Sequence, residues 1–122
     1  MYGIPENFDL SIILGSDLNM ISQGRYDVQF SFDAGIKICL QGIASVLQSG
    51  TEIAIWSEEK NWSSLGFQKL LNQSVESVLA PNIRLIEIHF KNSLVLQLHD
   101  SSDQYESMQI YFSNDSLPSV II

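Results

Sequence analysis

Apolar and polar residues alternate strictly on both sides of residues 33–35. The apolar positions are Val28, Phe30, Phe32, Ile36, Ile38 and Leu40. Alternation with a period of two is typical of a strand that buries one face. Residues 33–35 read Asp-Ala-Gly, and a three-residue hairpin loop places glycine where the backbone has positive φ. The pattern therefore predicts a hairpin in which Phe32 pairs with Ile36 and the six apolar side chains share one face.

A second hairpin with the same pattern follows at residues 83–98. Its apolar positions are Ile86, Ile88, Phe90, Leu94, Leu96 and Leu98. Phe90 matches Phe32 and Ser93 matches Gly35 at an offset of 58 residues. Because Ser93 stands where the first loop has glycine, we expect Asn92 to take the left-handed conformation instead.

The match between the two hairpins extends upstream. Leu71, Val75 and Val78 align with Leu14, Leu18 and Ile21 at an offset of 57 residues. The difference of one residue falls in the turns at Gly24 and at 81–82, where insertions are tolerated. We therefore predict one domain, residues 1–122, with an internal repeat of approximately 10–42 and 67–100.

Residues 63–80 fit two different structures. The apolar side chains fall at helical spacing and Pro81 would stop a helix, so periodicity alone predicts one helix over 64–80. The repeat instead predicts a short helix over 64–72, then a strand over 74–80 that pairs with 83–90. Residues 72–74, Asn-Gln-Ser, are a plausible break between them. We adopt the second structure, because it agrees with both halves of the chain.

The remaining segments complete the predicted fold. Residues 10–14 read as one turn of helix or a short strand, and residues 113–122 read as a tail. Further strands are expected at 18–22, 43–47, 51–56 and 108–112. The predicted class is α+β: a mainly antiparallel β-sheet of two related hairpin-containing halves, with one or two short helices.

The net charge of the chain indicates which classes of molecule it is expected to bind. The 122 residues include 14 acidic and 6 basic side chains, which gives a net charge of −8. Nucleic acids and anionic membranes bind clustered Lys and Arg, so we expect neither as a partner. A basic protein would be attracted by such a field. Acidic proteins are also common for solubility alone.

The sequence carries no recognisable catalytic or cofactor motif. A single Cys39 excludes an internal disulfide and a zinc site of the usual kind. In the second hairpin His89 should face Val95 and His99 should face Leu85, about 13 Å apart, too far to share a metal ion. We therefore expect no enzyme activity, no metal and no cofactor.

Two polar runs are candidates for binding a protein. The partner-binding residues that we predict from them are Glu58, Glu59, Asp100, Asp103, Tyr105 and Glu106. The first two lie beside Trp56 and Trp62, and exposed tryptophans next to acids suit an interface. Two other functions stay open: a small-molecule or carbohydrate-binding β domain that uses both tryptophans, and a hydrolase that uses His99 with Asp100 and Asp103.

The opening residues lack the basic start and long apolar core of a signal peptide. The longest apolar stretches, such as 12–14, are far too short to span a bilayer. We therefore expect a cytoplasmic protein. The sequence leaves open whether it is a monomer or a homodimer.

Residues 71–111 resemble a family of small bacterial immunity proteins that are encoded beside contact-dependent or other polymorphic toxins. The matching positions are Leu71, Val75, Val78, Phe90, Asn92, Leu94, Leu96, Asp100, Ser102, Tyr105, Glu106 and Ser107. The first half is similar to the family's opening hairpin through Gln29, Phe30, Phe32, Asp33 and Gly35. Ser93 departs from the family's pattern. The resemblance implies a non-enzymatic inhibitor that occludes the active site of a cognate toxin, with no shared catalytic residues. Together with the acidic charge, it suggests a basic nuclease as that toxin.

Overall fold

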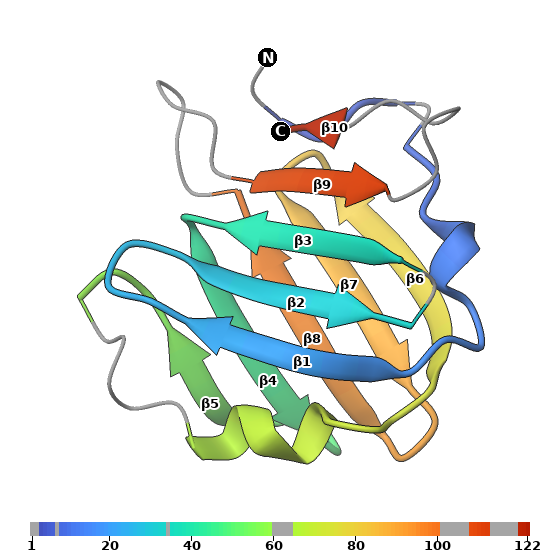
Figure 1. Cartoon of the computed structure of the whole chain (residues 1–122), viewed down its shortest axis with the longest axis vertical. Coiled ribbons are helices and arrows are strands. Elements are labelled where there is room, and N and C mark those ends of the chain that lie inside the picture. The colour runs from blue at the N-terminus through green and yellow to red at the C-terminus, as the bar shows by residue number, and fades with distance from the viewer. Residues whose placement is uncertain (1–2, 7, 34, 60–64, 101–107, 113–119) are drawn as a thin grey trace.

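The computed structural model describes residues 3–6, 8–33, 35–59, 65–100, 108–112 and 120–122. In these ranges ten strands form two antiparallel sheets, and the helices are two 3-10 helices. The sheets lie face to face with their strands crossing steeply (Figure 1). The class is therefore mainly antiparallel β. The α part of the predicted α+β class is corrected, because the helix expected at 64–72 is a 3-10 helix of six residues.

Sheet I has the order β1-β2-β3-β9-β10 and sheet II the order β5-β4-β8-β7-β6. The elements of sheet I are β1 (Leu18–Gln23), β2 (Val28–Phe32), β3 (Ile36–Leu40), β9 (Met108–Phe112) and β10 (Val120–Ile121). The elements of sheet II are β4 (Ile43–Gln48), β5 (Thr51–Trp56), β6 (Val75–Asn82), β7 (Leu85–Phe90) and β8 (Leu94–His99). The 3-10 helices are η1 (Ser11–Ile13) and η2 (Leu65–Leu70). The predicted strand over 74–80 is confirmed as β6, whereas β10 lies in what we expected to be a tail.

Both predicted hairpins form with the expected register. Phe32 pairs with Ile36 in the first, and His89 pairs with Val95 in the second. Gly35 has φ 81°, as a three-residue loop requires. The expectation for the second loop was wrong: Ser93, and not Asn92, is left-handed, with φ 68°. The loop geometry fixes which position has positive φ, so the residue at that position accepts a strain of about 1–2 kcal/mol.

The two three-stranded units, β1-β2-β3 and β6-β7-β8, meet at an isolated bridge between Asp17 and Ser74. The backbone hydrogen bonds around this bridge come in pairs related by the 57-residue offset. Leu18 N–H donates to Gln73 O and Val75 N–H donates to Ser16 O, at 3.2 and 2.9 Å. A second pair joins Gly15 N–H to Val75 O and Asn72 N–H to Leu18 O, both at 2.8 Å.

The positions of Gly15 and Asn72 are related by the same offset, and both are left-handed, with φ 77° and 65°. The side chains of Asp17 and Ser74 also meet, because the Ser74 hydroxyl donates to Asp17 Oδ1. These contacts join an edge of sheet I to an edge of sheet II.

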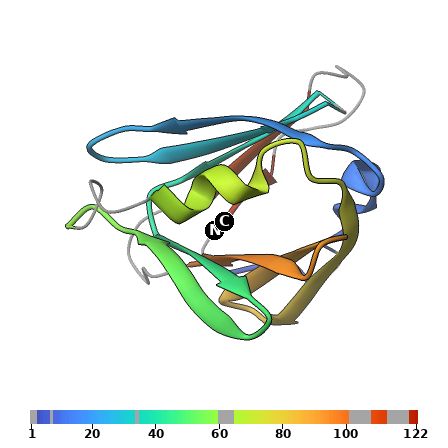
Figure 2. The same cartoon turned by 90° about the horizontal axis from the view of Figure 1, so that it is seen from below.

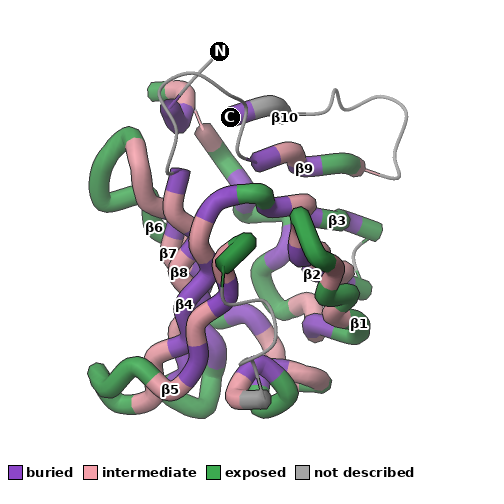
Figure 3. The backbone as a smooth tube through the Cα atoms, turned by 90° about the vertical axis from the view of Figure 1, so that its left-hand side faces the viewer, coloured by how far each residue is buried: buried purple, intermediate pink, exposed green. Residues whose placement is uncertain are grey.

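The core lies between the two sheets. Buried and half-buried positions alternate along strands such as β2, β7 and β8 (Figure 3), and η2 covers the lower end of the sandwich (Figure 2). Phe67 of η2 packs its ring 6.1 Å from that of Phe30. Gly66 permits η2 to lie close to β5, because a Cβ at that position would lie 2.8 Å from both Ala54 Cβ and Ile53 O. The apolar face of each hairpin is therefore used to build the fold, and binding is left to loops and outer faces.

Candidate functional site

The residues predicted to bind a partner do not form one described patch. Glu58 and Glu59 are exposed immediately after β5. Asp103, Tyr105 and Glu106 lie outside the described residues. Their part in binding therefore stays a prediction.

Asp100 has a role inside the fold. Its side chain is fully buried, and Asp100 Oδ2 accepts hydrogen bonds from Gly3 N–H at 2.9 Å and from Arg84 Nη1 at 3.1 Å. The register positions this pair, because Leu85 pairs with His99 and the residues beyond them are neighbours. This carboxylate holds the N-terminal segment against sheet II and is not presented to solvent. The sequence held one signal for this pair. Arg84 directly precedes Leu85, which the predicted register places opposite His99, so Arg84 is expected to lie opposite Asp100.

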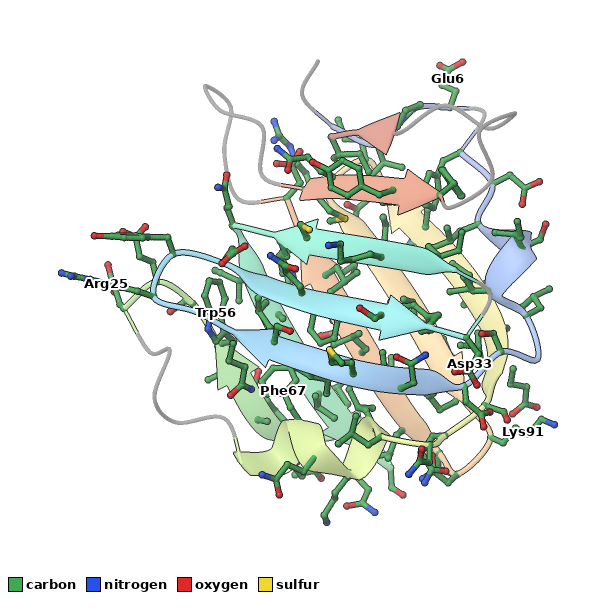
Figure 4. The ribbon with its side chains drawn as sticks, in the orientation of Figure 1. Glu6, Arg25, Asp33, Trp56, Phe67 and Lys91 are labelled. Carbon is green, nitrogen blue, oxygen red and sulfur yellow. The ribbon has the colours of Figure 1, made fainter. Side chains whose placement is uncertain are left out.

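The indole of Trp56 lies in the core with no exposed surface. Figure 4 shows it on the side of the molecule where the β1–β2 loop projects. Its Nε1 atom has no hydrogen-bond partner among the residues that the structure describes. Trp62 lies outside the described residues. The carbohydrate-binding hypothesis required both indoles in an open groove, and the burial of Trp56 counts against it.

The two histidines lie on the outer face of sheet II, as the register predicts. His89 Nε2 lies 3.4 Å from Glu87 Oε1, and Gln97 Nε2 donates to Glu87 Oε2 at 2.8 Å. Partial burial lowers the pKa of His99, against the opposite influence of Glu52 and Glu87. Among the described residues no three His, Cys, Asp or Glu side chains gather to hold a metal ion.

The outer faces of the two sheets differ in charge. The strands of sheet I contain no Asp or Glu and a single Lys37, and their outward positions include Gln29, Ser31 and Cys39. The strands of sheet II contain no Lys or Arg, but they contain Glu52, Glu76 and Glu87. The outward apolar positions of sheet II are Ile43, Leu47, Ile55, Leu79, Leu85 and Val95. Sheet II therefore presents an acidic and apolar face, and sheet I a nearly uncharged, mainly polar one on which Met20 and Tyr111 are also exposed.

Two shallow grooves lie beside β6, which is the edge strand of sheet II. One, of about 130 Å³, lies between η1 and β6 and includes Phe8, Leu14 and Leu79. The other, of about 330 Å³, includes Ile4, Phe8 and Ile83. Pro81 has no N–H to donate and discourages further strand addition at this edge. The lining is mainly apolar, with no converging acid and base that would indicate catalysis.

Comparison of the chain with protein-family models, curated proteins and solved structures gives no match. No helix in the described part of the chain is long and apolar enough to cross a membrane. The two grooves are shallow, and the outer face of sheet II is acidic and apolar. Such surfaces suit the binding of another protein better than the enclosure of a small substrate.

Proposed function

We propose that this protein is an immunity protein: a cytoplasmic, non-enzymatic inhibitor that binds a cognate secreted bacterial toxin and occludes its active site. The toxin is expected to be a basic nuclease, whose substrate groove must attract phosphates. An acidic inhibitor competes for the same positive groove. The observation that carries the proposal is the separation of charge between the two sheets, within a chain of net charge −8.

Electrostatics explains why such a separation suits an inhibitor. Complementary fields raise the rate of encounter between oppositely charged proteins and fix their relative orientation. An evenly spread surplus of acids would provide solubility without orientation. Here the glutamates of the described strands all belong to sheet II, and the one Lys of those strands belongs to sheet I, which gives the molecule an acidic side. The resemblance of residues 71–111 to immunity proteins supports the same function.

Co-expression with the toxin domain encoded beside this gene is the test. The expected result is a complex that survives size-exclusion chromatography at micromolar concentration and lacks nuclease activity. A control with an acidic protein of similar size checks that binding is not charge alone. The absence of any complex at micromolar concentration would contradict the proposal.

We also infer that the two three-stranded units are an internal repeat. The paired hydrogen bonds around Asp17 and Ser74, and the left-handed Gly15 and Asn72, support this inference. The units share an inner face that builds the core. Function is then expected where they differ, on the outer faces.

A further inference from the structure

We propose that the outer face of sheet II is the surface on which the basic partner docks. This surface, the sheet II face, consists of the outward residues of β4, β5, β6, β7 and β8. The inference rests on the proposed function and assigns it to one side of the molecule. It places the interface on the outer face of a sheet, whereas the sequence analysis placed it on two acidic loops.

The apolar character of this face is the first reason. Ile43 and Leu85 lie on either side of His99, while Leu47 and His89 lie on either side of Val95. These side chains are only partly buried, and no described segment lies over the face in Figure 2. In an antiparallel sheet with one solvated face, polar residues normally occupy the outward positions. The apolar positions flank a polar rung of Ser45, Gln97 and Glu87. Apolar side chains at so many outward positions favour an interaction surface.

The charge of this face is the second reason, and it identifies the kind of partner. Glu87 lies on the inner strand β7, while Glu52 and Glu76 belong to the edge strands β5 and β6. The strands supply no Lys or Arg to neutralise them. Two cations lie next to these strands in sequence, Arg84 in the β6–β7 turn and Lys91 in the β7–β8 turn, and Arg84 pairs with the buried Asp100. A partner that presents both basic and apolar side chains complements this pattern.

A second copy of the chain is a poorer occupant of the same face. A two-fold contact would bring Glu52 and Glu87 of one copy toward the same glutamates of the other, with no Lys or Arg in the strands of sheet II to pair with them. Like charges brought together in this way cost several kcal/mol. The occupant that fits is therefore a cationic protein surface.

The test uses two substitutions that each add one positive charge at an outward position of an inner strand. Val95→Lys places it on β8 in sheet II, and Gln29→Lys places it on β2 in sheet I, where the native side chain is also half-buried. Affinity for the toxin domain encoded beside this gene is measured by titration calorimetry. We expect Val95→Lys to weaken binding at least about tenfold, as loss of an interface anchor does, and Gln29→Lys to change it less than about threefold.

A milder variant guards against misfolding. Glu87→Gln keeps the size of the side chain and should weaken binding about threefold to tenfold through loss of one charge. Thermal unfolding of each variant confirms that it folds. If the native protein binds but Val95→Lys and Glu87→Gln bind equally well, the docking surface is wrong and the proposed function stands. If the native protein does not bind, both proposals are wrong.

Discussion

The units β1-β2-β3 and β6-β7-β8 have the same strand order and the same three-residue second loop. They differ in the length of the first loop, in the residues at the left-handed positions and in the residues on the outer face. The first unit has Gly15 and Gly35 at its two left-handed positions, and the second has Asn72 and Ser93. Two outward positions of the first unit hold Gln29 and Ser31, and the matching positions of the second hold glutamate and histidine. The shared backbone tolerates different turn residues because the buried faces fix it. Outer positions are free to diverge, since they contribute little to the core.

The largest expected effect tests whether the two units share one core. Phe30 and Ile88 occupy matching positions and are both fully buried. We expect Phe30→Ala to lower the free energy of unfolding by about 3–5 kcal/mol and Ile88→Ala by about 2–5 kcal/mol. Urea denaturation, followed by tryptophan fluorescence and by far-UV circular dichroism, measures both losses. Coincident transitions are expected in each variant, and separate transitions would mean that the units unfold independently.

Exchanging the turn residues tests the strain at the matched left-handed positions. Gly35→Ser should lower the free energy of unfolding by about 1–2 kcal/mol, because it adds a Cβ at φ 81°. Ser93→Gly should raise it by up to about 1 kcal/mol, since relief of strain is partly offset by the entropy of glycine. Thermal denaturation of the two variants gives the signs. A stabilising Gly35→Ser would show that the loops are not equivalent.

The contact between Asp17 and Ser74 tests the junction between the units. Removal of the hydroxyl in Ser74→Ala should cost about 1 kcal/mol of stability, as for an ordinary hydrogen bond. In Asp17→Ala and in the double variant we expect the backbone hydrogen bonds around positions 17 and 74 to remain. A double-mutant cycle should therefore give a coupling energy of about 0.5–1 kcal/mol. A coupling energy near zero would mean that only the backbone hydrogen bonds stabilise the junction between the units.

The smallest expected effect concerns His99, whose match in the first unit is Gln41. Burial lowers the pKa of His99 in the folded state, so the unfolded state binds the proton more readily. This contribution to stability is present above the unfolded pKa of about 6.5 and is lost as the pH falls toward the folded value. His99→Gln should therefore reduce the loss of stability between pH 7 and pH 5. Urea midpoints at several pH values check this, and equal pH profiles would contradict it.

Local patterns in the sequence predict the strands and both hairpins, because alternation and turn residues act over a few positions. The register of Phe32 with Ile36 follows from loop length alone. The repeat also resolves residues 74–80, where helical spacing competes with strand pairing. The positive φ of Ser93 was missed because residue preference was weighed above loop geometry.

Contacts between distant segments could not be predicted in the same way. The order of strands in sheet I depends on the pairing of β3 with β9, and no periodic signal marks that pairing. The burial of Asp100 requires Arg84 and Gly3 to converge from different parts of the chain. Of the candidate site, sequence reasoning gave the acidic charge and the positions of the histidines, but not the separation of charge between the sheets. That separation depends on the sheet to which each strand belongs.

The pairing of β3 with β9 also has a consequence for how the chain folds during synthesis. Each hairpin closes a loop of three residues, whereas this pairing closes a loop of roughly 70 residues and has a larger entropic cost. Folding should therefore begin in the two hairpins and end at this edge. During synthesis, one side of β3 stays unpaired until β9 has left the ribosome. In that interval the nascent protein is most exposed to wrong strand partners.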